Sequence, residues 1–260
     1  KVLINFSQII NKRSDLAKMS KDIMVSLLNT TNEEYKNMLL TNFLYEAINA
    51  FNIDLVEFLL DKNVPYEFAL IKAVSVEDKK IVELVLKHDS LPSFINKISK
   101  NGTALSIAVK LKNIDIVKIL LSISGIEPSI NIDGETPLIT AFSLFDIDII
   151  NLFFDFYGEN IQAQIWQVNC ALKMVLNELY FNYAKYGSSA SSVIQKILEV
   201  KNIDYNYHIN NYNLLTYACQ TNQKDIAEKL LNFDDINTNI ISNKHGITPL
   251  MFAVENNNLE

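Results

Sequence analysis

The chain has 260 residues, of which 49% are hydrophobic and 20% are charged, so it can bury a large core and is not a chain that is disordered throughout. The formal net charge is −7 at pH 7, and no cluster of Lys and Arg is present that could neutralise phosphates. We therefore expect no nucleic acid and no anionic membrane as a partner.

The sequence also lacks the features of membrane and secreted proteins. No run of 18 apolar residues occurs, so we expect no membrane insertion and see no signal peptide. The two cysteines, Cys170 and Cys219, have neither CxxC nor Cys/His spacing, which argues against a disulfide framework and a structural zinc site. A reducing compartment, and hence a cytoplasmic location, is the prediction.

The first expected element, residues 1–41, has helical sequence without a repeat motif. Within it, TNEE from Thr31 to Glu34 can form a capping box, in which two side chains satisfy the backbone donors of a helix start. We predict that residues 1–41 form a helical cap or a degenerate helical pair.

From residue 42 onward, one pattern recurs along the chain. An anchor Ala has a Leu three residues before it and two apolar residues 12 and 13 positions after it. The anchors are Ala47, Ala73, Ala108, Ala141 and Ala218, and a further copy starts at Ala253. In four copies an Asp lies seven residues after the anchor, at Asp54, Asp115, Asp148 and Asp225. Such regular self-similarity predicts a repeat architecture.

One copy, residues 134–154, shows what each repeat contains. Thr136 can cap a first helix, Pro137 suits its first position, and Asp133-Gly134 is typical of a turn before it. Asp146 and Asp148 lie where a second helix starts, and carboxylates stabilise that positive end. The repeated aspartates are therefore interpreted as helix-start residues and not as catalytic carboxylates. Helices this short need stacking against neighbours to persist.

Two copies depart from the regular spacing. Ala47 and Ala73 are only 26 positions apart, which predicts helical hairpins without a projecting loop. Ala141 and Ala218 are 77 positions apart, and we predict a divergent repeat between them. Its helices would be residues 166–182 and 193–200, with an insertion near 183–192 whose GSSASS run forms a flexible loop.

The last copy, from Leu250 and Ala253, holds a first helix alone. We expect the native chain to continue beyond residue 260, and the apolar face of Leu250, Phe252 and Ala253 to be uncovered. Fraying or self-association of this end is the predicted consequence.

A turn followed by GxTPLxxA, then DIV or a near equivalent, then LL, at a period of about 33, resembles the ankyrin repeat. GETPLITA (134–141) and GITPLMFA (246–253) match that motif closely, and the resemblance covers residues 42–260 in about six units. The His that usually follows TPL is replaced by Ser106, Ile139 and Met251. The resemblance implies an all-α, ankyrin-repeat solenoid of stacked helical hairpins with short β-hairpin loops, in a divergent, protist-like protein.

Candidate catalytic residues are scarce. His88, His208 and His245 are far apart in the sequence, and no GxGxxG or GxxxxGK motif occurs. Cys170 and Cys219 have no basic neighbour that would activate a thiol. We therefore predict no enzymatic activity, no metal ion and no cofactor.

The resemblance implies that a protein partner is bound by the hairpin tips and the exposed side of the first helices, which line a concave groove. Those positions are Lys100, Asn101, Asp133, Glu135, Lys244 and His245 at the tips, and Lys110, Leu111, Ser143, Leu144 and Gln220 on the helices. Leu111, Leu144 and Phe145 could form an apolar patch or could pack under the following loop.

The segment IDYNYHINNY, residues 203–212, adds aromatic side chains to this set. Tyrosine is favoured at interfaces, so Tyr207 and Tyr212 are candidate contacts, although they could instead shield neighbouring hairpins. Tyr205 lies where the family has a packed apolar residue, so it is expected to point inward.

The predicted function is a non-catalytic protein–protein interaction module. Two alternatives stay open, namely a structural component of a larger assembly such as a cytoskeletal one, and the recognition arm of a larger enzyme. The sequence leaves the oligomeric state open.

Overall fold

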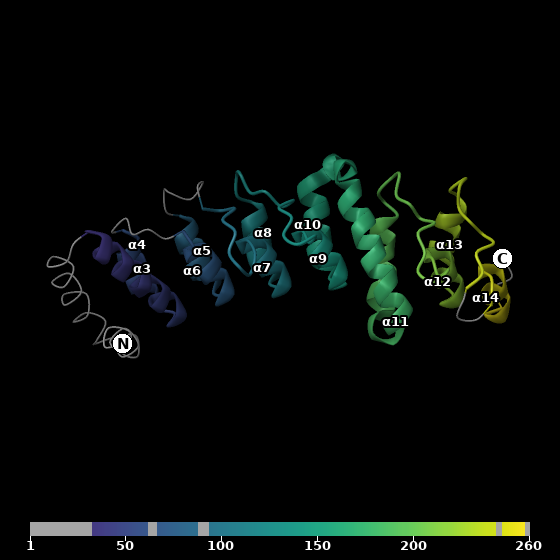
Figure 1. The fold of residues 1–260 in the computed structure, drawn as a ribbon, viewed down its shortest axis with the longest axis horizontal. Coiled ribbons are helices and arrows are strands. Elements are labelled where there is room, and N and C mark those ends of the chain that lie inside the picture. Colours follow the sequence, from purple (N-terminus) through teal and green to yellow (C-terminus); the bar gives the residue numbers. More distant parts are fainter. Residues whose placement is uncertain (1–32, 62–66, 88–93, 243–245, 258–260) are drawn as a thin grey trace. The chain divides into compact units, whose positions relative to one another are not determined.

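The computed structural model describes residues 33–61, 67–87, 94–242 and 246–257 (Figure 1). The predicted capping box at Thr31, the cap over residues 1–32 and part of the short loop before Ala73 lie outside the described residues. The chain divides into two compact units, residues 1–127 and residues 128–260, each of which is built from pairs of helices.

The first unit holds six described helices in three pairs. They are α3 (Glu33–Asn49), α4 (Ile53–Leu60), α5 (Ala69–Ser75), α6 (Lys79–Leu86), α7 (Ala104–Lys110) and α8 (Ile114–Leu121). Each first helix packs against its own second helix, and α3, α5 and α7 follow one another in one layer while α4, α6 and α8 form the other. This is the stacking of helical hairpins that the repeats predict.

The second unit is also built from helical hairpins, and one of its repeats is enlarged. Its described elements are α9 (Pro137–Ser143), α10 (Ile147–Tyr157), the 3-10 helix η2 (Gly158–Gln164), α11 (Ile165–Ile197), α12 (Leu214–Gln220), α13 (Lys224–Leu231) and α14 (Pro249–Glu255). Helix α9 packs on α10 and α11, while α12 packs on α13 and α14. Figure 1 shows α11 extending beyond the ends of both α9 and α12.

Local capping starts these helices where the sequence predicts. The Thr136 side chain accepts a hydrogen bond from the Ile139 amide at 3.3 Å, and Pro137 occupies the first turn. The second helix of this pair is capped by an aspartate, since Asp146 accepts a hydrogen bond from the Ile149 amide at 3.1 Å. The predicted helix-start residues Asp54, Asp115, Asp148 and Asp225 all lie in first turns.

The core consists of the side chains that define the repeat. The anchors Ala47, Ala73, Ala108, Ala141 and Ala218 are all buried. The apolar pairs of α4, α8 and α10 are buried as well, whereas in α6 Val85 is buried and Leu86 is half-buried. A methyl group at each anchor allows the neighbouring helices to approach closely. Larger side chains from adjacent helices then fill the remaining space.

The divergent repeat is present, but the predicted loop inside it is wrong. Leu172, Val175, Ile194 and Ile197 are buried, and the helical break falls at Asn182, with φ −132° and ψ 32°. The GSSASS run at 187–192 is helical. Ala190 is fully buried there, and the Ser191 hydroxyl donates a hydrogen bond to Gln223 Oε1 at 3.0 Å, so packing on the next hairpin overrides weak helical propensity.

Short hairpin tips precede three of the first helices. They are closed by isolated antiparallel bridges, Ser99 with Gly102, Ile132 with Glu135 and Ile209 with Tyr212. Asp133 and Gly134 have φ of 54° and 87°, and both central residues of the 209–212 turn also have positive φ. Two central residues with positive φ are typical of tight hairpin turns, which Asp-Gly and Asn-Asn adopt at little cost.

In two of the repeats an asparagine ties the segment before the tip to the loop that follows the next second helix. Asn96 Nδ2 donates to the Gly125 carbonyl at 2.8 Å, and its Oδ1 accepts from the Glu127 amide at 2.9 Å. Asn206 makes the same pair of bonds to Asp235 and Asn237, both at 2.7 Å. Both asparagines lie 12 residues before an anchor Ala. Successive loops are thereby held in register.

The last helix differs from the prediction in which residues it exposes. Leu250 is 71% exposed as expected, but Phe252 is buried and Ala253 is half-buried. Because α14 packs against α12, one side of the helix is covered and Phe252 belongs to that side. The uncovered apolar side chains are instead Leu250, Met251 and Val254.

Candidate partner-binding surface

In the first unit, the predicted residues occupy a hairpin tip and a helix end. Lys100 and Asn101 are exposed on the tip, where Ser99 and Gly102 exchange backbone hydrogen bonds of 3.0 and 3.1 Å. The Ser99 hydroxyl oxygen also accepts from the Asn101 amide at 3.2 Å. Lys110 and Leu111 are exposed where α7 ends. The predicted positions of this unit therefore place two cations, one amide and one apolar side chain at the surface.

In the second unit, the first predicted tip is exposed and firmly held. Asp133 and Glu135 are exposed, and Asn131 Oδ1 accepts a hydrogen bond from the Gly134 amide at 2.8 Å. At the base of the tip, Thr136 Oγ1 donates to the Oε1 atom of the buried Gln167 at 2.5 Å. The tip carries two carboxylates on a backbone that has little freedom to move.

The end of α9 is less open than the tip. Ser143 and Leu144 are half-buried, and the following residue, Phe145, is buried. The Phe145 ring stacks on Tyr186 of α11, with ring centroids 4.1 Å apart and an interplanar angle of 17°. Of the two interpretations of the apolar residues here, packing is confirmed for Phe145.

Tyr205 points inward as predicted. Its hydroxyl donates a hydrogen bond to the Val200 carbonyl at 2.6 Å, and its ring stacks on Phe233 with centroids 4.5 Å apart. Burial raises the pKa of the Tyr205 hydroxyl from 10.0 to about 12.

Substituting Tyr205 with Phe is expected to flatten the alkaline loss of stability. In the unfolded chain Tyr205 ionises near pH 10, while in the folded chain it stays neutral up to about pH 12. Its contribution is therefore fully present below pH 10 and is lost as the pH rises through 12. Urea unfolding of the wild type and of Tyr205→Phe across this range measures the difference. Two parallel curves would contradict the raised pKa.

The two tyrosines predicted as contacts differ in exposure. Tyr212 is only 5% exposed, its ring packs edge-on to Tyr180 at 5.6 Å, and its hydroxyl donates to Gln220 Oε1 at 2.8 Å. The expectation that Tyr212 projects from the loop is therefore wrong, because the longer α11 reaches over it. Tyr207 is half-buried, and Lys173 Nζ lies 5.1 Å from its ring centroid. Tyr207 keeps a surface that a partner can touch.

The remaining predicted positions are at the last two first helices. Gln220 is exposed at the end of α12 and accepts the Tyr212 hydrogen bond. Lys244 and His245 lie outside the described residues.

Comparison with protein families agrees with this architecture. The model for ankyrin repeats matches the sequence in three copies, over residues 43–132, 70–165 and 181–260. The chain is an ankyrin repeat protein. Ankyrin repeats are generally protein–protein interaction modules and are typically non-catalytic. A search of curated proteins found no match.

The enlarged ankyrin repeat contributes surface residues that the sequence analysis missed. Lys173, Asn177 and Phe181 are exposed, and their spacing of four places them along one side of α11. Lys173 joins this stripe to Tyr207 of the next tip. The signal was present in the sequence, because Leu172, Val175, Leu176 and Leu179 mark the opposite, buried side.

The ankyrin scaffold shows little that could support chemistry. Among the described residues, no group of three or more His, Cys, Asp or Glu side chains could hold a metal ion. Burial raises the pKa of the Cys219 thiol, which makes it a poor nucleophile. Within the same described part of the chain, no helix is long and apolar enough to span a membrane.

Proposed function

We propose that this ankyrin repeat protein binds a protein partner, without catalysis, through its tips and first helices. The contact residues in the first unit are Lys100, Asn101, Lys110 and Leu111. Those in the second unit are Asp133, Glu135, Ser143, Leu144, Tyr207 and Gln220, together with Lys173, Asn177 and Phe181. The observation that carries the proposal is that most of these side chains are exposed while the backbone beneath them is fixed.

Rigid tips favour binding because association then orders little of the chain. The bridge between Ile132 and Glu135 and the side-chain bond from Asn131 hold the 131–135 turn before any partner arrives. A preorganised loop loses less conformational entropy on binding than a mobile one. Contacts at Asp133 and Glu135 therefore contribute to affinity without a large loss of conformational entropy in the loop.

The charges on these surfaces indicate how a partner is oriented. The first unit offers the cations Lys100 and Lys110, and the 131–135 tip of the second unit offers two carboxylates. The rest of the second unit's set is uncharged except for Lys173. Complementary charges set orientation and the rate of association more than affinity. A partner region of opposite charge suits each unit taken by itself, namely acidic at Lys100 and Lys110 and basic at Asp133 and Glu135.

Photo-crosslinking tests the location of the surface. A photoreactive residue is placed at Asn101, Glu135 or Gln220, and in matched variants at Lys118, Asp155 or Lys229, which are exposed on second helices. We expect one discrete crosslinked protein from the first set and none from the second, in lysate of the native cells. Crosslinking of that protein only from the second-helix positions would place the surface elsewhere.

Tyr207 then tests the energetics with the partner so identified. Tyr207→Ala is expected to weaken binding by about 1 to 2 kcal/mol, because tyrosines at the centre of an interface contribute disproportionately. Its half-buried side chain is a small part of the core, so the melting temperature should change little. A loss of stability with unchanged affinity of the folded molecules would show that Tyr207 only shields its neighbours.

The two free cysteines support a cytoplasmic location for this partnership.

A further inference from the structure

One side of α11 is exposed over about four turns and carries an aromatic residue at each end. Trp166, Lys173, Asn177 and Phe181 are all exposed, Trp166 by 44% and Phe181 by 64%. At about 100° per residue, the last three lie within about 60° of Trp166 around the helix axis. We call these four side chains the α11 stripe. Large aromatic rings exposed together on one face indicate a binding surface, and Trp contributes strongly to interfaces.

The α11 stripe lies on a rigid support. Val168 and Val175, on the opposite side of the helix, are fully buried. The helical break at Asn182 comes directly after Phe181, so all four residues of the stripe share one regular helical segment. The ring of Tyr180 packs edge-on to Phe181, with centroids 4.8 Å apart. A partner therefore meets a preformed surface and orders little of this chain when it binds.

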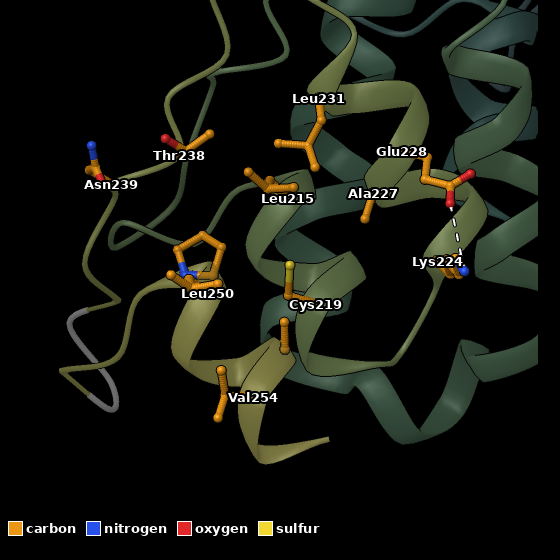
Figure 2. A pocket seen from close by; sticks show the side chains of 12 residues that line it. Leu215, Cys219, Lys224, Ala227, Glu228, Leu231, Thr238, Asn239, Leu250 and Val254 are labelled. Carbon is orange, nitrogen blue, oxygen red and sulfur yellow. Dashed lines mark ion pairs between the residues drawn. The ribbon is translucent and has the colours of Figure 1, made fainter. Parts of the chain in front are cut away.

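Lys173, near the middle of the stripe, forms no ion pair with any described residue. A lysine of α13 behaves differently, because Lys224 Nζ lies 3.9 Å from Glu228 Oε1 (Figure 2). Lys173 Nζ instead lies 5.1 Å from the centroid of the Tyr207 ring, which favours one position of the ammonium group at the surface. Lys173 carries the only charge of the stripe, so the stripe attracts a carboxylate at its centre.

The backbone of the occupant decides which form it takes. An extended segment needs hydrogen-bond partners for its backbone, and the stripe offers only the side chains of Asn177 and Lys173. A helix bonds its own backbone and needs side-chain contacts alone. Trp166 and Phe181 lie about 22 Å apart along the axis, which a helix spans with about 15 residues. Lys173 lies close to halfway between them, so its partner carboxylate lies near the middle of that helix in either orientation.

We propose that the α11 stripe binds an amphipathic helix of the protein partner. Apolar residues at both ends of that helix cover Trp166 and Phe181, and an Asp or Glu near its middle pairs with Lys173. This inference rests on the proposed function and adds to it the chemistry of the partner. Trp166 thereby joins the contact residues.

Crosslinking from Phe181 tests which segment of the partner lies on the stripe. A photoreactive phenylalanine analogue replaces Phe181 in the whole chain, in lysate of the native cells, and the crosslinked peptide is sequenced. We expect a segment of the same protein that Glu135 or Gln220 captures, with helical spacing of its apolar residues and an Asp or Glu near its middle. A segment without this pattern, or a different protein, would overturn the proposal.

A charge exchange tests the role of Lys173. A synthetic peptide of the crosslinked segment, with any tryptophan replaced by phenylalanine, is titrated into the whole chain. Trp166 is the only tryptophan of the chain, and its burial should shift the emission to shorter wavelength. Lys173→Glu should weaken binding at least about tenfold, and a peptide with Lys in place of the central carboxylate should restore it. A purely structural role of Lys173 would give no such restoration.

Lys229→Glu is the matched control, because it makes the same charge change at an exposed position of the second helix α13. This variant should bind the original peptide as the wild type does. A peptide that leaves the Trp166 emission unchanged, or a charge exchange that restores no affinity, would contradict the proposal. Failure of the proposed function would appear differently, since no protein would then be crosslinked from Asn101, Glu135 or Gln220.

Discussion

Tyr212→Ala is expected to lower the free energy of unfolding by about 3 to 5 kcal/mol, the range for truncating a large buried aromatic side chain. Tyr212 is 5% exposed, and its ring lies against Tyr180 of the enlarged repeat. Truncation leaves a cavity between α11 and the 209–212 tip and removes the hydrogen bond to Gln220. Urea unfolding followed by far-ultraviolet circular dichroism gives the difference directly.

Tyr207→Ala is the control, because it removes the same side chain from the same hairpin. Tyr207 is only half-buried, and its aromatic ring is approached by one lysine from α11. Its truncation should cost about 1 kcal/mol or less. If both substitutions cost equally little, Tyr212 is not packed as described and regains its place among the candidate contacts.

The repeat architecture could be predicted because its signals are local. Thr136 and Pro137 start α9 through bonds and dihedral preferences that span a few residues, so the sequence is sufficient to locate the helix. The anchor alanines recur because every hairpin meets the same neighbour geometry, and that regularity can be read without knowing any contact. The hairpin turn at Asp133-Gly134 follows from backbone preferences in the same way.

The failures share a different physical origin, since each depends on a distant contact. The GSSASS run has weak helical propensity, and only the burial of Ala190 and the bond from Ser191 to Gln223 keep it helical. Tyr212 is covered by Tyr180, which lies in a repeat of unexpected length. The sequence locates the helix that contains Phe252, but only the contact with α12 determines which side of that helix is buried.

The same difference between local signals and distant contacts explains which residues of the candidate surface were predicted. Exposed charged residues on tight turns, such as Lys100 and Asp133, were predictable because such turns project from the stack. The stripe of Lys173, Asn177 and Phe181 was missed because the divergent repeat lacks the motif that assigns positions to the partner-binding side. Its place on the surface follows only from the observed length and packing of α11.

Ala141→Leu is expected to lower the free energy of unfolding by about 1 to 3 kcal/mol, because a packed core has no room for added methylene groups. Ala141 is fully buried on α9, which packs against both α10 and α11. A leucine there must push one of these helices outward or adopt a strained rotamer. The displacement also separates residues on both neighbours that are themselves buried, including Ile150 and Leu172.

Ala253→Leu is the same substitution at the equivalent position of α14 and serves as the control. Ala253 is half-buried beside an apolar groove between α12, α13 and α14 (Figure 2), so a larger side chain can extend into it without moving a helix. Thermal unfolding of both variants should therefore show a lower midpoint for Ala141→Leu alone. Equal midpoints would mean that the helices around Ala141 are not closely packed. The same substitution would then lower stability no more at this buried position than at the half-buried Ala253.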